Sequence, residues 1–294
     1  YLQPKNGAKS FGTQLKNLEI KMEQIIQALP DARLLTDENG KSVLRVSLFN
    51  TGTRDAECRL GLSGRLLGTG ICSVKVAAGK SVTLDIPCEV MSKDGDAVLG
   101  LFFEGKLHKV PLRITENPSA KAGSVRNFAS PDKKISGSFK IERKEKAVEI
   151  TVRVKDSTDS GAEANKRALW EQDCVELFFD RTPGENSYEN PGYYTDNVFR
   201  LFILPRFKEN NIHFMNQPIR IDPVNLPCKV ETDAEGYTVK VTVPDSLLPA
   251  DKEFGFEVKV DDAETAGGKT VREAFWSNGK EPHQNRLAFG IIRK

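Results

Sequence analysis

Cysteine, histidine, methionine and tryptophan are all scarce in this chain of 294 residues. It has 5 cysteines, 3 histidines, 3 methionines and 2 tryptophans. No two cysteines stand in a Cys-x-x-Cys arrangement or another zinc-ligand spacing, so we do not expect a structural zinc site. The odd number of cysteines leaves at least one without a partner in the chain, and we interpret them mainly as small buried apolar residues.

Neither sign of charge dominates the sequence, and no long apolar run is present. Lys and Arg number 43 and Asp and Glu 41, which gives a formal net charge of +2. The chain therefore lacks the basic excess of nucleic-acid-binding proteins, and no stretch approaches the roughly 20 apolar residues that cross a bilayer. We expect no nucleic-acid partner and no membrane span. Because the chain begins at Tyr1 rather than at a methionine, we expect it to be a piece of a longer protein.

Short strands with alternating apolar residues account for most of the chain. Its length suggests two domains. Over residues 34–115 such strands recur about every ten residues, separated by turn signals such as Asn-Thr-Gly at 50–52, which is typical of a β-sandwich. Strands resume near residue 135. We therefore predict an all-β fold, with two β-sandwich domains in tandem and a short N-terminal helix.

The helix is predicted over residues 11–29, where apolar residues recur three or four positions apart and Pro30 ends the pattern. Its apolar face must cover something, so we interpret it as a docking helix, with a membrane-surface helix as the alternative. Residues 117–134 contain two prolines and few apolar residues, which predicts a linker or domain boundary. The predicted divisions are 1–33 (N-terminal segment with the amphipathic helix), 34–116 (first sandwich), 117–134 (linker or boundary) and 135–294 (second sandwich).

The strand that begins after Trp170 carries the clearest functional pattern. Its apolar residues alternate with polar ones, so Glu176 lies on the face opposite the apolar set. The same reasoning on two later strands puts Arg200 and Lys259 opposite their apolar neighbours. If the three strands share one sheet, these charges share one outward surface. A carboxylate, a guanidinium and a nearby indole suit a sugar, whereas the alternative is a cross-strand ion pair with Trp170 as an apolar plug.

Several short motifs in the second half carry a family resemblance. They are VRVKD at 152–156, WEQDCVE at 170–176, FFD at 178–180, FR at 199–200, GYTV at 236–239, GFEVKVDDA at 255–263, FWS at 275–277 and FG at 289–290. In order and spacing, residues from about 125 to 294 resemble the family 9 carbohydrate-binding modules, which are accessory domains of xylanases and related bacterial proteins. The first sandwich resembles the immunoglobulin-like accessory domains of bacterial carbohydrate-active proteins.

The resemblance implies a β-sandwich that binds small sugars and polysaccharide ends between two tryptophans. Trp170 corresponds to the first of them, and Glu176 and Arg200 to hydroxyl-binding residues. Lys259 stands where the family can carry an amide. The position of the second tryptophan falls near His283, so the second wall is left open among residues that include His283. The other candidates are Tyr188, Tyr193, Tyr194 and Trp276.

The function that the resemblance implies is non-catalytic binding of oligo- or polysaccharides. The chain would be an accessory region of a bacterial carbohydrate-active or cell-surface protein, located extracellularly, at the cell surface or in the periplasm. It would not be an enzyme, and any catalytic domain would lie upstream, outside this chain. No cofactor is required, but members of the family bind structural Ca²⁺. Carboxylates that could ligate it through oxygen, or that are simply scattered loop acids, are Asp156, Asp180, Asp261 and Asp262.

Two other classes of function stay open. The missing second tryptophan motivates a structural or interaction module whose sugar site has decayed. His213 and Met215, two positions apart, motivate a haem-binding relative of the same sandwich superfamily. A glycosidase is disfavoured, because a sandwich of about 160 residues leaves little room for two catalytic acids at a defined separation.

Overall fold

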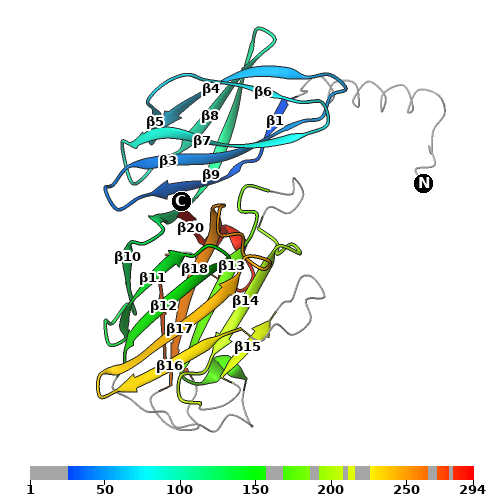
Figure 1. The fold of residues 1–294 in the computed structure, drawn as a ribbon. Helices are drawn as coiled ribbons and strands as arrows, with labels where there is room; N and C mark the ends of the chain where they lie inside the picture. Colours follow the sequence, from blue (N-terminus) through cyan, green and yellow to red (C-terminus); the bar gives the residue numbers. More distant parts are fainter. Residues whose placement is uncertain are drawn as a thin grey trace, which may run out of the picture. The chain divides into compact units, whose positions relative to one another are not determined.

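The fold is described from a computed structural model (Figure 1). The structure describes residues 26–156, 168–185, 192–207, 211–215, 226–263, 270–277 and 281–294. Two compact units divide the chain, the first within residues 1–32 and 44–114 and the second within 33–43 and 115–294. Strands make up almost all the regular structure of both, which confirms the predicted all-β class. No helix among the described residues is long and apolar enough to span a membrane.

The first unit is a sandwich of short antiparallel strands. One sheet has the order β6–β4–β8–β9, and the other contains β1, β3, β7 and β5. Burial alternates strictly along β4, so its even-numbered residues from Ala56 to Leu62 face the core and its odd-numbered ones face outward. The strands are β1 (Ile26–Ala28), β2 (Asp31–Thr36), β3 (Ser42–Asn50), β4 (Ala56–Gly64), β5 (Leu66–Gly68), β6 (Cys72–Val76), β7 (Ser81–Val90), β8 (Ala97–Phe103) and β9 (Lys106–Lys121).

The second unit is a larger sandwich around one apolar core. One sheet has the order β10–β11–β12–β17–β16. The other has the order β15–β14–β13–β18, and both β19 and β20 pair with β18. The strands are β10 (Val125–Ala129), β11 (Ser136–Arg143), β12 (Ala147–Lys155), β13 (Cys174–Asp180), β14 (Val198–Ile203), β15 (Ile212–Met215), β16 (Cys228–Asp233), β17 (Gly236–Pro244), β18 (Phe254–Asp262), β19 (Arg272–Phe275) and β20 (Gly290–Arg293).

An aromatic row in the core fixes the register of the central strands. Phe179 on β13 lies opposite Phe199 on β14 and Phe256 on β18, with ring centroids 4.6 Å and 5.5 Å away. Such ring pairs contribute about 0.5–1.5 kcal/mol each beyond their buried area. A slip of one residue would turn all three rings outward. The packing of this row therefore determines which residues occupy the opposite face of the sheet.

Two predictions about the chain's organisation are corrected by the strands. Residues 117–134, predicted as a linker or domain boundary, are not a linker, because β9 runs to Lys121 and β10 covers Val125–Ala129. The boundary between the two units lies just before them, between residues 114 and 115. The prediction was wrong because these small polar residues carry no local strand pattern. The end of β9 forms a parallel pair with β20, which lies far along the chain. The end of the predicted helix is strand β1, which pairs with β3, while the rest of that helix, residues 11–25, lies outside the described residues.

Candidate functional site

The three charged residues predicted to share a surface do share one. Glu176 on β13 lies opposite Lys259 on β18, and its neighbour Phe178 lies opposite Arg200 on β14. Paired residues in an antiparallel sheet point to the same side, and the apolar core occupies the other side. We call this surface of β14, β13 and β18 the charged face.

The charges on this face form a compact network. Lys259 Nζ donates to Glu176 Oε1 at 3.0 Å and lies 2.8 Å from a carboxylate oxygen of Asp261 and 2.8 Å from one of Glu273. Arg200 Nη1 lies 3.2 Å from Glu176 Oε2. The ion pair that was the alternative interpretation is therefore present. Glu176 is only 1% exposed, whereas the Glu273 side chain is 49% exposed at the edge strand β19.

Burial changes the protonation of this network. Burial, and then the charge of Glu176, raise the pKa of Asp261 well above its ordinary value. Burial acts to lower the pKa of Lys259, but the charges of Asp261 and Glu176 outweigh it and raise that pKa. A higher pKa favours the neutral form of Asp261 and the charged form of Lys259.

Two buried polar atoms of the network, Glu176 Oε2 and Arg200 Nε, form no hydrogen bond among the described residues. Glu176 Oε2 is nevertheless in an ion pair, since it lies 3.2 Å from Arg200 Nη1. Leaving a buried donor or acceptor unpaired costs about 1–3 kcal/mol. A hydroxyl group both donates and accepts. Because both atoms are buried, a ligand hydroxyl could bond them only after neighbouring side chains move.

Aromatic side chains flank the charged face. Trp170, in the 3-10 turn η2 (Leu169–Glu171), is 45% exposed, and its ring centroid lies 6.2 Å from that of Phe202. Arg200 lies over the Phe202 ring at 4.5 Å. Phe275 on β19 pairs with Lys259, is half-buried, and its ring centroid lies 5.9 Å from Lys259 Nζ. Phe202, Glu176, Lys259 and Phe275 thus follow one another across the sheet.

The candidates for a second aromatic wall have separate positions. Trp276 packs against the core, with its ring centroid 5.0 Å from that of Phe139. Gly290 leaves room for the indole, since a Cβ at position 290 would lie 2.4 Å from it. Trp276 is therefore not the second aromatic wall of a sugar site. Within the described residues His283 has one hydrogen-bond partner, Gln284. Of the loop tyrosines, Tyr194 packs against Phe289, Tyr193 is exposed, and Tyr188 lies outside the described residues.

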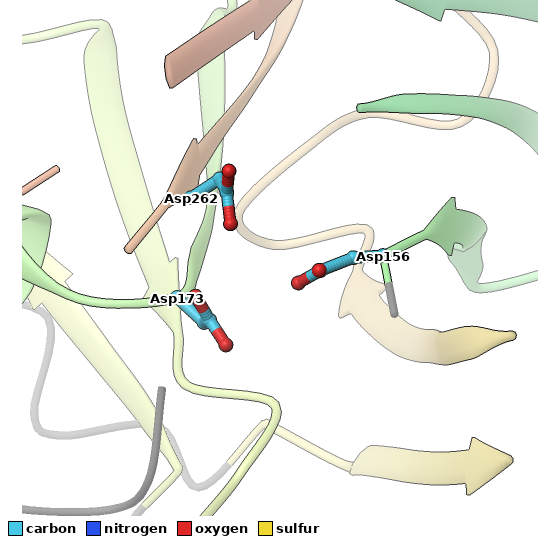
Figure 2. A group of neighbouring side chains, drawn as sticks. All are labelled: Asp156, Asp173 and Asp262. Atoms are coloured by element: carbon cyan, nitrogen blue, oxygen red, sulfur yellow. The ribbon is translucent and has the colours of Figure 1, made fainter. Parts of the chain in front are cut away.

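A second acidic group lies at the ends of the strands. Asp156 after β12, Asp173 before β13 and Asp262 at the end of β18 are buried, with carboxylate oxygens within 4.8 Å of one another. Figure 2 shows the three carboxylates directed toward a common space. Arg206 lies 3.5 Å from Asp173 and 3.9 Å from Asp156, and Arg272 lies 2.9 Å from Asp262.

This group partly matches the acids proposed from the sequence. Asp156 and Asp262 belong to it, whereas Asp180 faces Arg286 and Asp261 belongs to the charged network. Asp173 was missed, although it stands in the WEQDCVE motif. Three carboxylates offer up to six oxygens, which suits the six to eight that Ca²⁺ takes. The donor set therefore fits calcium.

A buried glutamate ties the end of β19 to β18. Glu257 accepts hydrogen bonds from the backbone N–H groups of Trp276 at 2.8 Å and Ser277 at 3.1 Å. Burial raises its pKa to about 7, although those hydrogen bonds act in the opposite direction. Because β19 carries Glu273 and Phe275, Glu257 helps to hold the edge of the charged face.

The stability contribution of Glu257 is expected to depend on pH. Its folded-state pKa of about 7 exceeds the ordinary 4.5, so the contribution is fully present below pH ~4.5 and is lost as the pH rises through about 7, a change of about 3 kcal/mol. Urea unfolding at a series of pH values should show the free energy of unfolding of wild type falling relative to that of Glu257→Gln over this range. Parallel pH profiles for the two proteins would contradict this protonation state.

Comparisons with known proteins agree with this architecture. Residues 116–293 match the model of the family described as carbohydrate family 9 binding domain-like. None of the curated proteins matches the chain. Two matching solved structures are family 9 carbohydrate-binding modules from Caldicellulosiruptor kristjanssonii, one in complex with glucose and one with cellotriose. A third is a multidomain protein from Bacteroides ovatus.

The three structural similarities are weak. The glucose complex is 19% identical, with 57% of this chain and 80% of that chain covered and a TM-score of 0.44. The cellotriose complex is 18% identical, with 60% and 91% covered and a TM-score of 0.46. The Bacteroides ovatus protein is 10% identical, with 83% and 86% covered and a TM-score of 0.20. Since every TM-score lies below 0.5, no conclusion rests on them.

The family match covers more than half of the chain, from the end of β9 to β20. The second unit thus defines a β-sandwich binding module. The chain belongs to the carbohydrate family 9 binding domain-like family, a family of non-catalytic carbohydrate-binding modules.

Proposed function

We propose that the second unit binds a carbohydrate on its charged face, and that the chain is not itself an enzyme. The sugar ring stacks on the exposed indole of Trp170, and its hydroxyls bond Glu176 and Arg200. Lys259 holds Glu176 in place, and Glu273 and Phe275 contact the ligand at the other edge. The observation that supports this most strongly is the exposed indole of Trp170, whose ring lies 6.2 Å from that of Phe202, the residue opposite Glu176 on the charged face.

The charged face is better suited to bind one sugar unit than several consecutive units of a polysaccharide. Glu176 is buried and leaves little of its carboxylate for a ligand, while Trp170 offers a single exposed ring. Lys259 already lies within 3.0 Å of three carboxylates, so its remaining capacity for a ligand is small. A chain end or a single sugar unit fits this arrangement. His283 stays a candidate contact, although it has only Gln284 as a partner among the described residues.

Isothermal titration with a panel of sugars tests the proposal. The panel contains glucose, xylose, galactose and the β-1,4-linked oligomers of the first two. We expect saturable binding of at least one member, with similar affinity for a monosaccharide and for its oligomers, because only a chain end enters the site. Absence of binding by every member at millimolar concentration would favour a module whose sugar site has decayed.

The haem alternative has little support from the residues that motivated it. His213 and Met215 lie on the same face of β15, but Met215 packs against the cluster of Cys174, Phe202 and Leu204. The thioether is thus part of an apolar contact. A Soret band that appears when the protein is mixed with haem would revive this function.

We propose in addition that Asp156, Asp173 and Asp262 hold a structural Ca²⁺. The ion would bind three buried carboxylates, near which Arg206 and Arg272 also lie. It would also join the ends of β12 and β18 to the segment that leads into β13. Since Trp170 and Glu176 lie on that segment and strand, calcium would stabilise the sugar-binding face without touching the sugar.

Calcium is expected to raise the thermal midpoint of unfolding. An excess of about 100 times the Kd stabilises by about 2.7 kcal/mol, which corresponds to about 5 °C or more for a unit of this size. Calorimetry in CaCl₂ and in EDTA measures it. Asp173→Asn should abolish the difference, and the matched control Asp233→Asn, which removes an exposed carboxylate bound to Arg153, should keep it. Equal midpoints in CaCl₂ and EDTA for wild type would exclude this site.

The wider setting follows from the family. We propose that the chain is an accessory region of a bacterial carbohydrate-active or cell-surface protein, secreted or held at the cell surface or in the periplasm. A catalytic domain would lie upstream. Detection of the protein in the culture medium or in a periplasmic extract, rather than in the cytoplasm, tests the location.

A further inference from the structure

An open apolar trough lies on the outer face of one sheet in the first unit. A pair of glycines, Gly61 on β4 and Gly100 on β8, lie directly opposite each other in the middle of the sheet. A Cβ built on Gly61 would meet nothing within 4 Å. The cavity above them has a volume of about 390 Å³.

The walls of the trough are large, exposed and apolar. Phe102 is 44% exposed and Leu107, opposite it on β9, is 59% exposed. Ile71, at the β6 end, is 79% exposed. Val98 lines the cavity on the other side of the two glycines. Exposed apolar surface gathered around a hollow marks interaction sites on soluble proteins.

The two glycines lower the stability of the sheet, which suggests that the space above them has a function. Glycine within a strand weakens it, by roughly 0.5–1 kcal/mol relative to alanine, and often marks the close approach of another molecule. Here two of them oppose each other, and neither has a positive φ that would require glycine. The space between the walls fits one bulky apolar side chain.

The charges at the trough indicate an acidic partner. Arg59 lies opposite Phe102, and Lys109 lies opposite Gly100. Within the described residues neither cation forms an ion pair, and both line the cavity. A second copy of the chain would bring these cations against themselves in a two-fold interface. A sugar would find few hydroxyl-binding groups, because Ser63 is the only uncharged polar side chain in the lining.

We infer that this trough is the docking site for an acidic segment of another protein. One bulky apolar side chain of that segment would occupy the space above Gly61 and Gly100, between Phe102 and Val98. Carboxylates beside it would pair with Arg59 and Lys109. This role belongs to the first unit and does not depend on the sugar site of the second.

Selection from a library of random 12-residue peptides displayed on phage, against the full chain, tests the inference. Enriched sequences should share a bulky apolar residue flanked by Asp or Glu. In fluorescence anisotropy with the enriched peptides, Gly61→Leu should weaken binding at least tenfold, because its side chain extends into the trough from a Cβ that meets nothing within 4 Å. Ser81→Leu, which adds a leucine at an exposed position of β7, is the matched control and should leave binding unchanged.

A second set of variants tests the inference in case Gly61→Leu does not fold. Arg59→Glu with Lys109→Glu, and separately Ile71→Ser with Phe102→Ser, alter only exposed walls and should each weaken binding at least tenfold. The inference is overturned if no peptide is enriched, if the enriched peptides are basic, or if they bind these variants as well as wild type. Sedimentation that shows a dimer dissolved by Gly61→Leu would assign the face to a second copy instead, and would also overturn it.

Discussion

Trp170→Ala is expected to weaken sugar binding at least thirtyfold while leaving the fold intact. The indole is the only exposed tryptophan ring of the two in the chain, and it lies beside the charged face. Removal of a central aromatic anchor costs binding about 2 kcal/mol or more, which is about thirtyfold in Kd. Because the ring is 45% exposed and lies outside the apolar cores, stability should change by no more than about 0.5–1 kcal/mol.

Titration calorimetry on the sugar that binds most tightly measures this effect. Trp170→Phe is the matched variant, because it keeps a smaller stacking surface and should lose only part of the affinity. Thermal unfolding of all three proteins checks the fold. Binding by Trp170→Ala within twofold of wild type would place the sugar somewhere other than the indole.

Glu176→Gln is expected to affect both binding and stability. The substitution keeps the shape of the side chain but removes a buried charge that pairs with Lys259 and Arg200. Breaking a buried ion pair costs about 3–5 kcal/mol. Loss of a charged hydrogen bond to a hydroxyl costs about 1.5–3 kcal/mol, or roughly tenfold to a hundredfold in affinity. Urea unfolding and calorimetry measure the two effects on the same samples.

Asp261→Asn is the control for this experiment. Asp261 lies beside the same lysine and is equally buried, but its raised pKa favours the neutral acid. An amide of the same shape should therefore lower the free energy of unfolding much less than Glu176→Gln does, and should leave sugar binding unchanged. Equal losses from the two substitutions would mean that both carboxyls are charged in the folded protein.

The alternation of apolar residues was sufficient to place the centre of the candidate site. Glu176, Arg200 and Lys259 lie opposite buried residues on three strands, and those strands are neighbours in one sheet. Their phases could be predicted because each strand has six residues or more. The burial of Glu176 could not, since alternation along a strand does not tell how exposed the second face of the sheet is.

The edge of the site was missed for a related reason. Strand β19 has only four residues, too few for a period of two to be distinguished, so alternation did not reveal Glu273 or Phe275, although Phe275 stands in the FWS motif. Asp173 was overlooked because its partners, Asp156 and Asp262, come together only when three strand ends meet. In each case the missing information is a long-range pairing that no local pattern contains.

Quenching of tryptophan fluorescence tests the central claim most directly. In Trp276→Phe the emission comes from Trp170 alone, since the chain has 2 tryptophans. If a sugar stacks on that indole, a saturating concentration should protect it from quenching by acrylamide, with the same dissociation constant that calorimetry gives. Unchanged quenching in protein that calorimetry shows to be saturated would contradict a sugar site at Trp170.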